Sequence, residues 1–255
     1  MKIELKDDPR VRREQFNRRF REGLKLGADK ANAAFGKDWL DADGSIKMYE
    51  HPDRESDQRM IAMKEEQWAR EEGKNRESWR AGRDKKESIL AEMALTLFLQ
   101  RSLPPRYLAI RSSTYDDYEN GVDHLILDGE TGSVVGAIDE VVGLNGAGNK
   151  KEEKVRRKMH KGARIKYGAR VIEGELILGS ISHVPVFYIS LDKADLAKLG
   201  DSLMEDELGS YEQDLFRRLC ASFEEQAESY RGMSMPDELR EELEHFKESL
   251  NTWNE

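Results

Sequence analysis

The sequence predicts an α+β fold whose sheet-containing core carries helical extensions at both ends. Residues 84–101 are rich in Ala, Leu, Met and Glu, which favour helix. Residues 115–128 and 133–142 are alternating apolar segments around a turn with two glycines, which is typical of a β-hairpin. Only 38% of the 255 residues are hydrophobic and 36% are charged, so we expect a concentrated core with solvated helices around it.

Residues 1–83 are predicted to form a helical extension. The spacing of apolar residues over 9–35 favours an amphipathic helix, Gly36 and Pro52 mark a break, and 53–83 predicts an exposed helix interrupted at glycines. Residues 39–50 resemble a calcium loop in part. Trp39 stands at the first ligand position and cannot bind the ion, so we favour an ordinary acidic turn over a calcium site.

Residues 84–195 are predicted to form the α/β core. The helix over 84–101 is apolar on most sides, which indicates burial, and it carries Glu92 within its apolar stretch. Residues 107–112 predict a strand before the hairpin. If the hairpin turn centres on Thr131, the strand register predicts three facing pairs. These pairs are Leu127 with Val135, Leu125 with Ala137, and Asp123 with Asp139.

The predicted Asp123–Asp139 pair calls for a cation, because directly opposed carboxylates repel each other. A shared divalent ion is a common explanation, while a salt bridge or a turn cap for Asp123 is the structural alternative. Asp116 and Asp117 are expected to be loop acids, and their joining the site is the less favoured alternative.

The second half of the core is predicted to contain a basic helix at 151–161, a strand at 163–172, a turn at 173–175 and a strand at 184–191. Residues 196–255 are predicted to form an acidic helical extension. Leu239, Leu243, Phe246 and Leu250 recur there at helical spacing, which favours a docking face.

The net charge of −9 argues against general affinity for nucleic acid, but the charge is uneven. Residues 150–170 hold ten Lys/Arg against two acids, whereas 192–255 hold seven against eighteen. The single Cys220 excludes an internal disulfide. The charged start predicts no secretory signal, and no apolar run approaches the roughly 20 residues that span a bilayer. We therefore expect a cytoplasmic protein without a membrane segment.

Four short segments carry a resemblance to a known family: Tyr115–Asp123, Ala137–Asp139, Ile165–Tyr167 and Pro185–Val186. With the order of predicted elements over 85–195, the chain resembles the PD-(D/E)XK nuclease superfamily, and also uncharacterised proteins of candidate-phyla (Parcubacteria-type) bacteria. The resemblance implies a restriction-endonuclease-like αβββαβ core that uses Mg²⁺ or Mn²⁺.

In that family pattern Glu92 would be the helix acid, Asp123 the motif aspartate and Asp139 the first acid of the (D/E)XK pair, with Glu140 as a further ligand. The pattern is broken at the catalytic lysine, whose place Val141 occupies, and Val122 precedes Asp123 in place of proline. Lys166 is the lysine that we predict to act instead, and Lys154 and Lys158 remain alternatives.

The sequence therefore predicts Mg²⁺-dependent phosphodiester hydrolysis of nucleic acid, with DNA and RNA both open. The alternative is a non-enzymatic interaction or scaffold protein on a catalytically decayed nuclease fold, binding a protein partner or a second copy through its terminal helices. Phosphates would be held by basic residues of the second half of the core. These are Lys151, Lys154, Arg157, Lys158, Arg164, Lys166 and Arg170.

Overall fold

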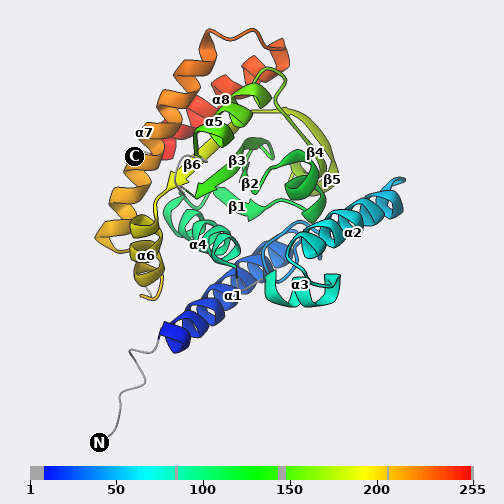
Figure 1. Ribbon diagram of the computed structural model, residues 1–255. Coiled ribbons are helices and arrows are strands. Elements are labelled where there is room, and N and C mark those ends of the chain that lie inside the picture. Colours follow the sequence, from blue (N-terminus) through cyan, green and yellow to red (C-terminus); the bar gives the residue numbers. More distant parts are fainter. Residues whose placement is uncertain (1–8, 84–85, 143–147, 206, 254–255) are drawn as a thin grey trace, which may run out of the picture.

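A four-stranded mixed sheet forms the centre of the computed structural model, which describes residues 9–83, 86–142, 148–205 and 207–253 (Figure 1). The first three strands form an antiparallel meander, and the last strand joins β3 in parallel, in the order β1-β2-β3-β6. The predicted α+β class is confirmed. The strands are β1 (Tyr107–Arg111), β2 (His124–Asp128), β3 (Val134–Val142) and β6 (Val186–Leu191).

The predicted hairpin is present between β2 and β3, and its register differs from the prediction on one side. Leu125 pairs with Ala137 as expected, but Leu127 pairs with Val134 and not with Val135. An irregularity between Ile126 and Leu127 shifts the strands by one residue there. The prediction assumed uninterrupted pairing, which the strand sequence alone does not guarantee.

A second, two-stranded sheet lies between α5 (Gly148–Lys158) and β6 in the chain. It consists of β4 (Ala163–Ile172) and β5 (Glu175–Val184), joined by a turn in which Glu173 has φ 52° and Gly174 has φ 80°. The predicted strand and turn are confirmed. The strand β5 was not predicted.

Helices α4 (Glu87–Ser102), α7 (Ser210–Arg231) and α8 (Asp237–Trp253) bury much of the hydrophobic core. The predicted docking face of the last helix is confirmed, because its four apolar residues are all buried. Phe246 stacks on Phe187 of β6 with ring centroids 3.9 Å apart. The short helix α6 (Lys193–Ser202) connects β6 to α7.

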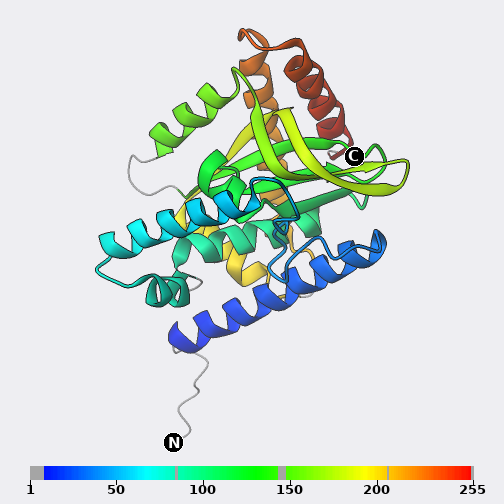
Figure 2. The same ribbon diagram turned by 90° about the vertical axis from the view of Figure 1, so that its right-hand side faces the viewer.

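The N-terminal extension contributes one helix to the core and an arm beside it. Helix α1 (Pro9–Ala34) crosses α4 closely, since a Cβ at Gly23 would lie 2.7 Å from the Leu97 side chain. Helices α2 (Arg54–Glu71) and α3 (Arg76–Arg83) project to one side as an arm (Figure 2). Within the described ranges, no helix is long and apolar enough to cross a membrane.

The predicted turn is present in the segment over 39–50. Gly44 has φ 78° and donates its N–H to the Asp41 carbonyl, while the Asp43 carboxylate accepts the N–H of Ser45 at 3.1 Å. Asp43 also pairs with Arg111 of β1 at 2.8 Å. The acids of this segment therefore fix the turn against the sheet.

One hydrophobic cluster joins the three predicted segments. It includes Leu24 of α1, Leu95 of α4 and Leu243 of α8. The core therefore continues across the boundaries proposed after residues 83 and 195. These boundaries stay a prediction.

Candidate functional site

The structure brings Asp123 and Asp139 together at one end of the central hairpin. The N–H of Asp123 donates to the carbonyl of Ile138 at 3.0 Å, and its carboxylate accepts the N–H of Glu140 at 2.5 Å. His124 pairs with Ile138, so the same antiparallel register continued by one residue sets Asp123 opposite Asp139. Asp139 is 2% exposed. Two carboxylates therefore share one largely buried place, as the sequence predicts.

A lysine reaches this pair from α5. The Lys158 amine lies 3.2 Å from Asp139 Oδ2 and donates to the carbonyl of Gly121 at 2.5 Å. Burial holds the pKa of Lys158 below its usual value, while the charges of Asp139 and Asp123 act in the opposite direction. The Lys154 amine also lies close to Gly121. A Cβ at Gly121 would be 2.9 Å from Lys158 Nζ and 3.2 Å from Lys154 Nζ.

Lys166, the lysine favoured by sequence reasoning, is directed elsewhere. Its amine pairs with Asp57 at 2.7 Å and Asp53 at 3.0 Å and lies 5.0 Å from the centre of the Tyr115 ring. These partners belong to the N-terminal arm and the loop before η2, so Lys166 ties β4 to the arm. Sequence position could not reveal this, because the two acids that hold the Lys166 amine are more than 100 residues away.

Glu92 and Glu140 do not share the surroundings of the pair. Glu92 forms an ion pair with Arg111 at 2.8 Å, and the same guanidinium also holds Asp43. Glu140 follows Asp139 directly on β3, so its side chain leaves the strand on the opposite face. The predicted four-carboxylate set is thus divided between two faces of the sheet.

The five-residue π-helix η2 (Asp116–Asn120) lies between these groups and was not predicted. Asp116 is fully buried, and its carboxylate accepts hydrogen bonds from Ser113 and Asn120 side chains and from the N–H groups of Lys166 and Tyr167, at 2.7–3.0 Å. Four donors satisfy it completely, so Asp116 fastens η2 to β4.

Asp117, the next residue of η2, has a different environment. Burial and the nearby charges of Asp123 and Glu92 raise the pKa of Asp117 well above its ordinary value, despite the opposing guanidinium of Arg111. Asp117 and Glu92 both line a cavity of about 300 Å³ beside α2 and α3. The sequence does not distinguish Asp117 from an ordinary loop acid, because the position of its side chain depends on the π-helical geometry of η2.

Comparisons of the chain with protein-family models, with curated proteins and with solved structures each found no match. Membership of the PD-(D/E)XK superfamily therefore stays a prediction that rests on the motif residues.

The described residues contain no group of three or more His, Cys, Asp or Glu side chains placed to hold a metal ion together. Mg²⁺ does not require three protein ligands. The ion commonly binds to one or two carboxylates and completes its coordination shell with waters and substrate phosphate oxygens. The hard oxygen donors of Asp123 and Asp139 fit this chemistry, whereas the histidines are scattered.

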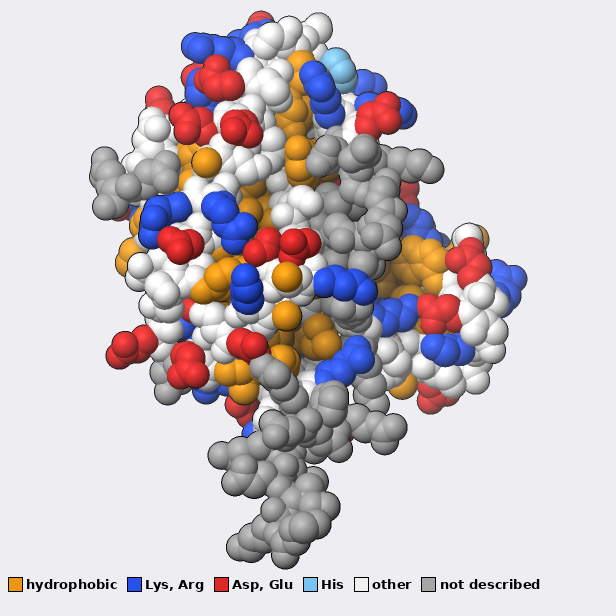
Figure 3. All heavy atoms as spheres, turned by 60° about the vertical axis from the view of Figure 1, so that its left-hand side comes forward, with side chains coloured by type: hydrophobic (Ala, Val, Ile, Leu, Met, Phe, Trp, Pro, Cys, Tyr) orange, Lys and Arg blue, Asp and Glu red, His pale blue; other side chains and the backbone are white. Residues whose placement is uncertain are grey.

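The predicted phosphate-binding residues lie mainly on the surface of α5 and β4. Lys154, Arg157 and Arg164 are exposed, although Arg157 pairs with Glu153 at 2.5 Å. The side chain of Lys151 lies outside the described residues. On the face seen in Figure 3, basic and acidic side chains are interspersed rather than gathered into one basic surface.

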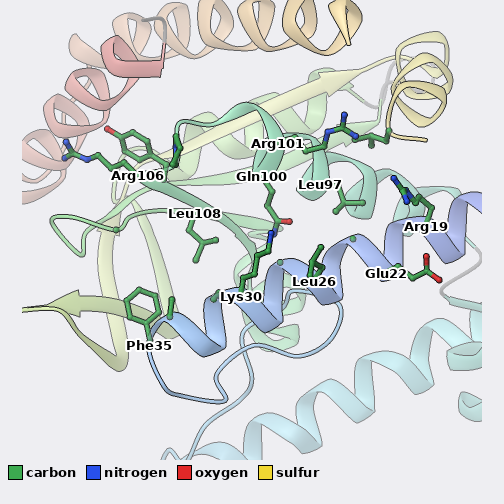
Figure 4. A pocket seen from close by; sticks show the side chains of 18 residues that line it. Arg19, Glu22, Leu26, Lys30, Phe35, Leu97, Gln100, Arg101, Arg106 and Leu108 are labelled. Carbon is green, nitrogen blue, oxygen red and sulfur yellow. The ribbon is translucent and has the colours of Figure 1, made fainter. Parts of the chain in front are cut away.

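A larger cavity of about 810 Å³ lies between α1 and α4, away from the predicted site residues. Leu26 and Lys30 of α1 face Leu97 and Gln100 of α4 across it (Figure 4). None of the predicted catalytic, metal or phosphate-binding residues lines this space. Neither Asp123 nor Asp139 lines it, so this cavity is distinct from the place of the acidic pair.

Proposed function

We propose that this protein hydrolyses phosphodiester bonds of nucleic acid with the help of Mg²⁺ or Mn²⁺. The observation that carries the proposal is the Lys158 amine 3.2 Å from Asp139, beside the Asp123–Asp139 pair. The family pattern lacks its lysine two residues after Asp139, and Lys158 offers an amine at the acidic pair from a different element.

Asp123 and Asp139 would hold the ion, which supplies a Lewis acid for the phosphodiester and lowers the pKa of a bound water. Lys158 is in a position to orient the attacking water and to exchange a proton with it. Lys154, Arg157 and Arg164 would hold neighbouring phosphates by charge. In this assignment Glu92 is held by Arg111 and is not a ligand of the ion.

The element order supports a restriction-endonuclease-like core for this function. Helix α4, strands β1 to β3, helix α5 and strand β6 follow one another as the predicted αβββαβ order requires, with the β4–β5 hairpin added before the last strand. A fold assignment of this kind carries no activity by itself. The proposal therefore depends on the acidic pair and its lysine.

The test is a cleavage assay on single-stranded DNA, duplex DNA and RNA with Mg²⁺ or Mn²⁺ and with EDTA. Asp139→Asn should abolish metal-dependent cleavage, because it removes one ligand charge. Lys158→Met should lower the rate by about 10²–10⁴-fold, the usual contribution of a positioned proton carrier.

Matched controls are an exposed acid and an exposed lysine for which no contact with the pair is recorded among the described residues. Asp214→Asn on α7 and Lys161→Met after α5 should leave the rate unchanged. Metal-dependent cleavage that survives Asp139→Asn would exclude this site. Equal losses in Lys158→Met and Lys161→Met would show that α5 acts only by its charge.

One observation favours the alternative function, a binding or scaffold protein without cleavage. Lys158 already pairs with Asp139, and Arg111 with Glu92, so both acids are compensated by the protein's own cations. If no substrate is cleaved while nucleic acid still binds in EDTA, the alternative is the better description.

A further inference from the structure

The cavity beside η2 has the size and the walls of a site for one planar ring. It measures about 300 Å³, at the lower end of small-molecule sites. It is formed where the arm of α2 and α3 meets η2 and α4. Trp68 and Trp79 of the arm and Tyr118 of η2 line it.

The three aromatic residues support one another as a wall. Trp68 lies 4.8 Å from Tyr118 and 5.8 Å from Trp79 between ring centroids. The indole N–H of Trp79 donates to Glu72 at 3.0 Å, and the Tyr118 hydroxyl accepts from Arg83 at 2.7 Å. The Trp79 ring is 4% exposed and the Lys86 amine lies 4.6 Å from its centre, so the aromatic surface left for a ligand is that of Trp68 and Tyr118, which are half-buried.

The other lining residues include acids and cations in equal number, and among the described residues the acids differ in their partners. Glu92 and Asp43 both pair with Arg111. The Asp117 carboxylate receives no hydrogen bond within the described part of the chain, yet it lines the cavity and interacts electrostatically with Asp123. A carboxyl group beside an aromatic wall suits the amino edge of a nucleobase.

The nearby lysines indicate where the phosphates of a bound nucleotide lie. The cavity itself has a balanced lining, because the acids Asp43, Glu92 and Asp117 are accompanied there by Arg83, Lys86 and Arg111. The amines of Lys154 and Lys158 gather at Gly121, the residue that ends η2. A base held at Asp117 therefore leaves its phosphates on the side of these lysines.

We propose that this cavity binds one unpaired nucleobase of the substrate, stacked on Trp68 with its amino edge at Asp117. The inference rests on the proposed function and adds a substrate class to it: nucleic acid with a single-stranded or extruded nucleotide at the site of cleavage. Cytosine, adenine and guanine carry an amino group at the pairing edge, and thymine does not.

The experiment measures binding of the full chain to fluorescein-labelled strands of six positions by fluorescence anisotropy in EDTA. One strand is wholly abasic, one carries a single cytosine and one carries a single thymine. The cytosine strand should bind at least about fivefold more tightly than the abasic strand, the lower end of what stacking of one base contributes. The thymine strand should lie between the two.

Two variants separate stacking from edge recognition. Trp68→Leu should remove the preference for either base over the abasic strand. Asp117→Ala should remove the preference for cytosine over thymine and keep the advantage of both over the abasic strand. Phe35→Leu, a half-buried aromatic residue at the other cavity, is the matched control and should change none of the three affinities.

Equal binding of the cytosine and abasic strands, absence of measurable binding, or a preference that survives Trp68→Leu would overturn the inference. These outcomes are distinct from failure of the proposed function, because no metal is present. Base-dependent binding without cleavage in Mg²⁺ leaves the cavity assigned and removes the enzyme. Cleavage in Mg²⁺ without base-dependent binding would support the proposed function and remove the assignment of the cavity.

Discussion

Asp128 ends strand β2 as a fully buried carboxylate that the sequence does not mark out. Arg106 donates two hydrogen bonds to it, at 2.8 and 2.5 Å, and the N–H groups of Glu130 and Thr131 donate at 2.9 and 3.3 Å. Burial alone would raise its pKa, but these donors outweigh it and lower the pKa of Asp128 to about 2. The turn of the hairpin therefore depends on an ionised side chain.

Replacing this carboxylate should produce a loss of stability that depends on pH. The ordinary pKa of 3.8 lies above the folded value, so the contribution is complete above about pH 4 and disappears as the pH falls towards 2. Asp128→Asn should lower the free energy of unfolding by about 2 kcal/mol at pH 7, the equivalent of the shift in pKa. Urea unfolding of both proteins from pH 7 to pH 2 measures it.

Glu130→Gln provides the control for this measurement, because Glu130 also pairs with Arg106, at 3.0 Å, but is 69% exposed. Its loss should change the free energy of unfolding by less than about 1 kcal/mol at any pH. A constant difference between Asp128→Asn and the native protein over the whole pH range would show that shape and not charge matters there.

Residues of the candidate site differ in how far the sequence predicts them. Asp123 and Asp139 are predictable, because strand alternation places an acid where an apolar residue is expected. Lys158 is on a helix that was predicted, but which of its lysines faces the pair depends on how α5 is set against β3. The position of Asp117 depends on the π-helix η2, which no local sequence pattern predicts.

The turn between β2 and β3 shows how one element is docked on another. Gly132 has φ 73°, and its carbonyl accepts the N–H of Val171 of β4 at 3.0 Å. A Cβ at this position would lie 1.3 Å from the carbonyl oxygen of Val171. Both the left-handed backbone and the close approach therefore require glycine.

Gly132→Ala should consequently lower the free energy of unfolding by more than about 3 kcal/mol, since the turn must leave β4. Gly174→Ala is the matched control, because Gly174 also has positive φ, at 80°, but a Cβ there meets nothing within 4 Å. It should cost only the backbone strain, about 1 kcal/mol. Thermal unfolding compares the two, and equal losses would contradict a role for the contact with β4.

Elements with a strong period were predicted from the sequence, and those held by distant contacts were not. Helices α1 and α8 follow their apolar stripes, and α4 follows its run of apolar helix-forming residues. Strand β5 was missed because its burial pattern is irregular, with Gly179 and serines interrupting the alternation. The π-helix η2 was missed because its shape comes from the bonds of Asp116 to β4, which is about 50 residues away.

At the scale of the whole molecule, the sheet and its flanking helices share one core. Phe187 of the sheet contacts Phe223 of α7 and Phe246 of α8, with centroids 5.7 and 3.9 Å apart. Leu24 of α1 is fully buried in the same cluster. The predicted nuclease-like segment thus lacks a complete hydrophobic interior without both extensions.

A fragment of residues 84–195 should therefore fail to fold alone. Without α7 and α8 the ring of Phe187 loses its aromatic partners, and a fragment of this size does not recover that loss from its own surface. Circular dichroism should show no cooperative thermal transition for the fragment and a single one for the full chain. A cooperative transition in the fragment would instead establish the segment as an independent domain.

Hydrogen bonds between residues 37–57 and the strands β4 and β5 bear on the order in which the chain can fold during synthesis. Tyr49 donates to the Lys166 carbonyl, Asp57 accepts from Tyr167, and Lys37 donates to the Leu176 carbonyl, across 110 to 139 residues. Residues 37–57 must therefore wait until residues 166–176 have been synthesised before these polar groups are satisfied. During that interval Trp68 and Trp79 lie in a segment without its final partners, so the nascent chain is most vulnerable to aggregation and proteolysis before β5 emerges.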